Sequence, residues 1–370
     1  MRRYIGYCAI LFFLAFGLYK TTSVQKPSKT DADASPKWKN DAVNPEVTIK
    51  LGMSGQDLSI ALGRQRVRTS KQPMGVNFYE IHWPTKFPAR VNFIHGVNGF
   101  FLDAALSVMG TEDLEILGGV QNLDVNFGVT AADLIPHDEA RLEVMALLKR
   151  LQDAGWRQNY YFSEARIKGR STLTDPSSLD VRYTPTFNEW MAVGIRTASW
   201  KLQANGVFMD ISMHRDGDRM DPSWPGAYIM SMTLETEEQY MRSHFSEQDR
   251  DNWKALWPEF SKVLKKARAQ KETELRAQGL EIDTDYQDPP ILALQAPVVS
   301  LRVDQPCSRS GWWQATLPPS HPAAHLLAKA PQRWRQVRAG EPMPRMYSRL
   351  MFDSADADNA AITWVWVREA

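Results

Sequence analysis

The sequence predicts an α+β fold with mixed or antiparallel sheets and packed helices, an N-terminal membrane anchor and a small, loop-rich, mainly β C-terminal module. Several short runs alternate apolar and polar side chains, which is typical of half-buried strands. Two longer segments repeat apolar residues at helical spacing. An uncharged apolar run opens the chain, and a proline-rich stretch lies near its end.

The first twenty residues, 1–20, have the pattern of an export signal. Two arginines, Arg2 and Arg3, precede an uncharged run over residues 4–19 that is rich in Leu, Ile, Phe and Ala. Small residues at the spacing of a cleavage site do not follow, which favours a retained anchor; a cleaved signal is the alternative. The run is short for a hydrocarbon core of about 30 Å. The arginines predict a cytoplasmic N-terminus and an ectodomain on the other side of the membrane.

Three further regions follow from composition. Residues 21–46 are polar, contain three prolines and show no apolar period, so they predict a flexible tether. Residues 47–288 carry most of the periodic segments and predict an α+β ectodomain. Residues 289–370 are rich in proline and tryptophan, and we expect them to form the C-terminal module.

The first part of the ectodomain predicts mainly strands. Ser54 is placed to cap a short helix over residues 55–62, which Gly63 ends. Segments bounded by turn residues predict strands at 48–51, 76–83, 90–95 and 123–129, and we expect the strands at 76–83 and 90–95 to be adjacent.

A helix is predicted from a cap at Asp138 to Gly155. Its expected buried stripe consists of Leu142, Met145, Leu148 and Leu151. The following segments predict a strand at 160–167, a helix at 187–200, and a hairpin of strands 207–214 and 227–233 joined by a long polar loop.

The longest predicted helix runs from a cap at Ser246 to Gly279, with a kink or restart at Trp257-Pro258. Its second half, residues 265–278, is charged nearly all round, so we expect it to face solvent or another polar surface. The C-terminal module closes with a predicted strand at 361–367.

Charge and cysteine content exclude several classes of protein. A net charge of +1 gives no basic stripe, so we expect no nucleic-acid partner. Cys8 lies in the apolar run, which leaves Cys307 without a partner for an intramolecular disulfide or a cysteine-based zinc site. The seven histidines are scattered, and we expect no metal and no cofactor.

Motifs that would indicate an enzyme are incomplete. The sequence Gly52-Met53-Ser54-Gly55-Gln56 lacks the last glycine of G-x-S-x-G, and Ser54 fits a helix cap better. His95-Gly96 fits a turn between two strands better than a catalytic loop. His214-Arg215-Asp216 resembles a kinase triplet, but no phosphate-binding glycine loop accompanies it. We therefore expect no enzymatic activity, and a hydrolase without a recognisable motif is the minor alternative.

Tryptophan content points to a binding protein. The chain has thirteen tryptophans, several of them in predicted loops, and tryptophan and arginine often anchor protein interfaces. A large core would also bury tryptophans, and this explanation stays open. The residues predicted to contact a partner are in the polar hairpin loop and the C-terminal module: Arg215, Asp216, Asp218, Trp224, Trp312, Trp313 and Trp334.

The C-terminal module carries a resemblance. The sequence CSRSGWWQA begins at Cys307, RWRQVRAGEPMP spans 333–344, and TWVWV spans 363–367. This order resembles the tails of immunity proteins encoded beside polymorphic and type VI secretion toxins of proteobacteria. Segments 52–63, 108–119 and 128–148 are similar to periplasm-facing proteins from such gene neighbourhoods. The part of the resemblance that lies in the tail covers about a fifth of the chain. The resemblance implies that the protein is a periplasmic inhibitor.

Together these observations predict a single-pass inner-membrane protein whose periplasmic ectodomain binds and blocks a cognate secreted effector. The resemblance implies an immunity protein of a toxin–antitoxin pair, with a lipase as one candidate class of effector. A cell-envelope maintenance or assembly protein that acts as a binding module is the alternative. The two differ in that an immunity protein is dispensable unless its toxin is present.

Overall fold

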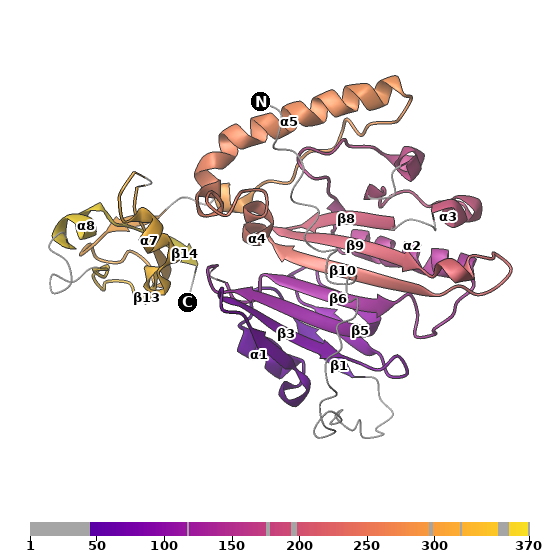
Figure 1. Cartoon of the computed structure of the whole chain (residues 1–370), viewed down its shortest axis with the longest axis horizontal. Helices are drawn as coiled ribbons and strands as arrows, with labels where there is room; N and C mark the ends of the chain where they lie inside the picture. The colour runs from indigo at the N-terminus through magenta and orange to yellow at the C-terminus, as the bar shows by residue number, and fades with distance from the viewer. Residues whose placement is uncertain are drawn as a thin grey trace, which may run out of the picture. The chain divides into compact units, whose positions relative to one another are not determined.

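The structure, a computed structural model, describes residues 45–368 apart from 117, 175–177, 194–197, 296–298, 319 and 347–354. The fold is α+β: within these residues, ten strands form one mixed sheet and four form a second sheet (Figure 1). The predicted anchor, residues 1–20, lies outside the described residues, as does nearly all of the tether, residues 21–46. Among the described helices, none has both the length and the apolar character that crossing a bilayer requires.

Strands β1, β4, β5, β6, β10, β9, β8 and β7 follow one another across the large sheet, and β2 joins through β3, which pairs with β5. The pairing is antiparallel except between β1 and β4. The bounds are β1 (Glu46–Ile49), β2 (Arg68–Lys71), β3 (Val76–His82), β4 (Ala89–Phe93), β5 (Phe100–Asp113), β6 (Asn122–Gly128), β7 (Arg157–Gln158), β8 (Ala198–Ala204), β9 (Val207–Arg215) and β10 (Tyr228–Thr236).

The long strand β5 organises the first half of the sheet. Its residues Phe100 to Ala105 pair with β4, and its residues Ser107 to Asp113 pair with β3. The predicted strands at 76–83 and 90–95 therefore exist, but the expectation that they are adjacent was wrong. Both lie along one edge of β5, whose length lets it serve two partners in turn.

The two faces of the large sheet differ in chemistry. On β6, the buried Leu123, Val125 and Phe127 alternate with the polar Asn122, Asp124 and Asn126. The side with Leu123, Val125 and Phe127 is called the helix-covered face. Residues of helix α2 (His137–Asp153) and Phe127 of β6 line the same cavity on this side. The second side is called the polar face.

Eight helices lie within the described residues, and several match the sequence expectations. They are α1 (Gly55–Ala61), α2, α3 (Phe187–Val193), α4 (Glu237–Arg242), α5 (Trp253–Ala277), α6 (Leu292–Gln295), α7 (Ala324–Lys329) and α8 (Ala355–Ala361). Ser54 caps α1 as predicted, since its hydroxyl accepts a hydrogen bond from the Asp57 amide. The predicted stripe on α2 was partly wrong. Leu142 is 52% exposed, whereas Val144 and Leu147 are buried.

Two predicted elements differ from the structure. Residues 160–167 form no strand, and the side chains there are fixed individually; the Tyr160 hydroxyl, for example, donates to the Ile167 carbonyl at 2.6 Å. The predicted helix at 187–200 ends at Val193, and residues from Ala198 onward belong to β8. In the second segment, pairing of residues from Ala198 onward with β9 outweighs local periodicity.

Helix α5 begins at Trp253, later than predicted, and continues through Pro258, which removes one backbone hydrogen bond. The burial of Trp253 and Trp257 in an aromatic cluster with Phe162 and Tyr240 offsets that loss. The charged second half of α5 meets a polar surface, one of the two expected outcomes. Glu272 is buried and accepts from the Arg166 guanidinium, with Nε–Oε1 at 2.7 Å.

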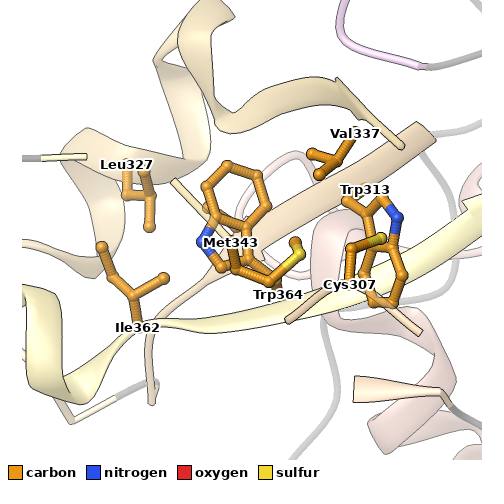
Figure 2. Packing of buried hydrophobic residues seen from close by; sticks show 8 residues of the cluster. Cys307, Trp313, Leu327, Val337, Met343, Ile362 and Trp364 are labelled. Carbon is orange, nitrogen blue, oxygen red and sulfur yellow. The ribbon is translucent and has the colours of Figure 1, made fainter. Parts of the chain in front are cut away.

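The C-terminal strands form the second sheet, in the order β11, β14, β12, β13. The bounds are β11 (Ser300–Arg302), β12 (Gly311–Thr316), β13 (Trp334–Val337) and β14 (Thr363–Arg368). The predicted strand at 361–367 is confirmed as β14. A core of its own supports this sheet, with Trp313 and Trp364 fully buried among aliphatic side chains (Figure 2).

Candidate partner-binding site

The polar loop between β9 and β10 is an ordered structure, fixed at both ends. The predicted hairpin is confirmed, with nine residues of each strand in register. At its C-terminal end, two residues before β10, Gly226 exchanges two backbone hydrogen bonds of 2.9 and 3.0 Å with Ile135, which fasten the loop to the segment before α2. The loop, residues 216–227, therefore presents its side chains from a fixed backbone.

The acidic residues of the loop serve its own backbone. Asp216 caps a single 3-10 turn, Gly217–Arg219, and accepts from the Asp218 amide at 3.0 Å. Asp221 accepts from the Ser223 amide at 2.8 Å. Within the described chain, no three His, Cys, Asp or Glu side chains are placed to hold a metal ion. The carboxylates of Asp216 and Asp221 therefore act as turn formers.

Arg215 lies beneath the loop. Its guanidinium is 5.2 Å from the ring centre of Trp190 and 5.0 Å from that of Tyr228, and it donates to the Trp190 carbonyl at 3.1 Å. Burial lowers the pKa of Arg215 from its ordinary value. The predicted partner residue Arg215 is thus half-buried, and its guanidinium holds two aromatic rings in place.

His137, the first residue of α2, completes this support. It is 2% exposed, and its Nδ1 shares a hydrogen bond with the Tyr228 hydroxyl. A side chain at Gly226 would come within 2.4 Å of the His137 ring, so a glycine is needed for this close approach. Burial lowers the pKa of His137 from 6.5, the charge of Arg215 lowers it further, and the carbonyls of Asp221 and Arg219 act in the opposite direction. We call His137, Trp190, Arg215 and Tyr228 the anchor cluster.

Trp224 is the side chain that this support exposes. Its indole is 70% exposed, although the Trp224 amide is bonded to the Asp221 carbonyl at 3.1 Å. Leu134, next to the residue that pairs with Gly226, is 42% exposed. A large aromatic side chain held in water on a fixed backbone is the arrangement that protein interfaces use as an anchor.

The predicted C-terminal residues have different environments. Trp313 is 0% exposed and lies in the core with Cys307, so its ring is not part of a contact surface (Figure 2). Its Nε1 donates to the Arg309 carbonyl at 3.3 Å. Trp312 and Trp334 are half-buried, and the Arg333 guanidinium lies 5.1 Å from the Trp334 ring centre. The structure therefore places Asp216, Asp218 and Trp224 in loop 216–227, directly after Arg215 at the end of β9, and it places Trp313 in a core.

A second polar site was not anticipated from the sequence. Asp124, Thr233, Asp210 and Lys201 are successive cross-strand neighbours on β6, β10, β9 and β8. The Thr233 hydroxyl donates to Asp124 at 2.6 Å, and the Tyr161 hydroxyl donates to Asp210 at 2.9 Å. We call these four residues, with Glu235, the carboxylate row of the polar face.

Glu235 has a strongly raised pKa in this row. It follows Thr233 by two residues on β10, so it points to the same face. Burial raises the pKa of Glu235 to about 7, and the charges of Asp210 and Asp124 contribute in the same direction. Burial also raises the pKa values of Asp124 and Asp210. The signal was present in the alternating polar residues of strands 207–214 and 227–233, but only the register shows which acids are neighbours.

Comparison with known protein families, curated proteins and solved structures gave no match for this chain. The site is therefore interpreted from its own geometry.

Proposed function

We propose that this protein is a binding protein whose loop 216–227 forms the contact surface, and that its biological role is that of a membrane-anchored periplasmic immunity protein. In this proposal residues 1–20 retain the chain at the inner membrane, and the ectodomain sequesters a cognate secreted effector without turnover. The role and the location come from the export-signal pattern and from the resemblance of the C-terminal tail.

One observation carries the binding part of the proposal. Trp224 is 70% exposed on a loop whose backbone is fixed by the Gly226–Ile135 pair and by the anchor cluster. Burying an exposed indole on binding is favourable, and a rigid loop loses little conformational entropy on binding. The half-buried Arg215 and the buried His137 support this loop.

Growth protection is the direct test. Each product of a neighbouring gene would be exported to the periplasm of a test cell, with and without this chain. We expect one product to be toxic alone and harmless when the full-length chain is present. The Trp224→Ala variant should lose protection and bind that product at least about tenfold more weakly, as expected for an interface anchor.

The matched control is Met74→Ala, because Met74 is another strongly exposed apolar side chain (77%) on a separate turn. This variant should protect as well as the wild type. Equal protection by Trp224→Ala would contradict the role of the loop. Absence of a toxic neighbour, together with a growth or envelope defect on deletion of this gene alone, would instead favour the envelope-maintenance alternative.

A further inference from the structure

Cations collect on one edge of the large sheet. The segment after α1 forms a 3-10 turn and then the edge strand β2. It carries four exposed cations, which we call the basic edge: Arg64, Arg66, Arg68 and Lys71. The sequence has no acid between Asp57 and Glu80. Because the whole chain is nearly neutral, with 44 basic and 43 acidic residues, this excess of positive charge is local.

The acids that flank the basic edge have partners of their own. Glu80 is the cross-strand neighbour of Arg68, and its carboxylate lies 2.8 Å from His82 Nε2. Asp57 accepts a hydrogen bond from the Ser54 hydroxyl at 2.8 Å. The other residues of β3 that pair with β2 are uncharged. The basic edge therefore keeps a positive surface toward solvent.

Protection of a sheet edge explains only part of this surface. Arg68 and Lys71 lie on β2 itself, where charged side chains discourage pairing with another chain. Arg64 and Arg66 lie before the strand. Ile60, four residues before Arg64, is 54% exposed. An exposed apolar side chain beside several cations is characteristic of segments that lie on a membrane surface.

The basic edge is on the side of the sheet where the chain enters the ectodomain. The predicted anchor and tether precede β1, whose pairing begins at Glu46. Strand β1 joins the sheet through β4, β2 joins it through β3, and β4 and β3 lie along the same edge of β5. Helix α1 packs against both β1 and β3. A chain anchored through residues 1–20 would present this side of the sheet to its own membrane.

We propose that the basic edge docks the ectodomain onto the anionic lipid headgroups of the membrane that anchors the chain. Each cation close to an anionic bilayer strengthens such docking by roughly fivefold at ordinary salt. Loop 216–227 joins strands on the other side of β5, so docking leaves this loop uncovered. The inference rests on the anchor part of the proposed function and does not depend on the effector.

The test places the full-length chain in vesicles from which detergent has been removed. One set is phosphatidylcholine alone, and the other contains about a quarter of anionic phosphatidylglycerol. A dye on Thr69→Cys, in a Cys8→Ala background, reports its distance from a headgroup-labelled lipid by energy transfer. Cys307 is buried and stays unlabelled. We expect at least about twofold more transfer in the anionic vesicles, and loss of this difference in about 0.5 M NaCl.

Two matched triple variants identify the cations that are responsible. The first removes three charges of the basic edge and should abolish the difference between the vesicles: Arg64→Gln, Arg68→Gln and Lys71→Gln. Arg66 is retained because it has a further interaction within the fold. The control removes three exposed charges from α5 and should respond as the wild type does: Lys265→Gln, Lys266→Gln and Lys271→Gln. All six side chains are exposed, so we expect both variants to fold.

Equal transfer in both vesicle types, or the same response from both triple variants, would overturn the proposal. Failure of the anchor has a different signature, because the wild type would then not float with the neutral vesicles. In that case, flotation with the anionic vesicles that is lost only in the β2 variant would still support the basic edge. Absence of flotation with either vesicle type would contradict both the anchor and the basic edge.

Discussion

Strands β9 and β10 carry two buried polar groups of opposite charge. At the loop end, the anchor cluster holds the cation of Arg215 and a neutral His137 against Trp190 and Tyr228. Further along the same strands, the carboxylate row gathers Asp124, Asp210 and Glu235 with Lys201. Burial shifts the pKa of His137 down and the pKa of Glu235 up. The hairpin thus contacts two titratable groups whose effects on stability depend on pH in opposite directions: His137 of α2 and Glu235 of β10.

The two sites differ in how their partly buried charged groups are hydrogen-bonded. In the anchor cluster, two aromatic rings and one backbone carbonyl contact the guanidinium of Arg215, while its Nε has no hydrogen-bond partner among the described residues. In the carboxylate row, hydroxyl donors from Thr233 and Tyr161 satisfy two acids, while Glu235 has a single amide donor, Asn122, at 3.3 Å. The anchor cluster supports loop 216–227, and the carboxylate row contains Glu235, whose pKa is raised to about 7.

The largest expected effect concerns the two faces of β9. Ile211 is fully buried on the helix-covered face, next in sequence to Asp210. Ile211→Asp should lower the free energy of unfolding by more than about 4 kcal/mol, because it buries an unpaired carboxylate. Ser212→Asp, on the polar face, should cost about 1 kcal/mol or less. Denaturant unfolding measures both, and similar losses would show that the faces do not differ as described.

The second prediction concerns the carboxylate row. Because the pKa of Glu235 is raised from 4.5 to about 7, the contribution of this group to stability is fully present below pH 4.5 and is lost as pH rises through 7. Glu235→Gln should therefore stabilise the protein by about 1–3 kcal/mol at pH 8 and by little at pH 4. Glu247→Gln, an exposed control, should change stability at neither pH. A pH-independent effect of Glu235→Gln would argue that the acid titrates normally.

The smallest expected effect concerns His137. Its pKa is lowered, so the contribution of the neutral ring is present above pH 6.5 and is lost as pH falls below that value. His137→Asn keeps a polar atom for Tyr228 and does not titrate, so it should remove about 1 kcal/mol of acid destabilisation between pH 7 and pH 5. Hydrogen exchange at the Gly226 amide reports the loop directly. Equal acid sensitivity of wild type and variant would exclude His137 as the titrating group.

Sequence patterns predicted the elements whose signals are local. Ser54 and the hairpin of β9 and β10 are examples, since a cap and a polar loop between alternating strands need no distant partner. The stripe on α2 was displaced toward Leu142 because two registers of apolar residues compete there, and only packing against the sheet chooses Val144 and Leu147. The helix at 187–200 was overextended because Ala198 to Ala204 pair with β9, a contact that periodicity does not show.

The candidate sites were predictable to different degrees. Loop 216–227 was expected to carry contact residues, and Trp224 is exposed there. Tryptophans in loops and in cores have the same appearance in a sequence, so the fully buried Trp313 was not distinguished from Trp224. The carboxylate row depends on the register of four strands. A shift of one residue would move Asp210 to the opposite face, so neighbours such as Asp124 and Asp210 emerge only from the pairing.

The strands at the borders of the large sheet are short. In the part of the chain that the structure describes, β1, β2 and β7 each pair with one strand, and they have four, four and two residues. Charged residues such as Glu46, Arg68 and Arg157 lie on them and are exposed. Short, charged borders give another chain few backbone groups to pair with, which limits fibre formation and aggregation through strand addition. In the membrane-anchored form proposed above, where the local protein concentration would be high, this protection would be useful.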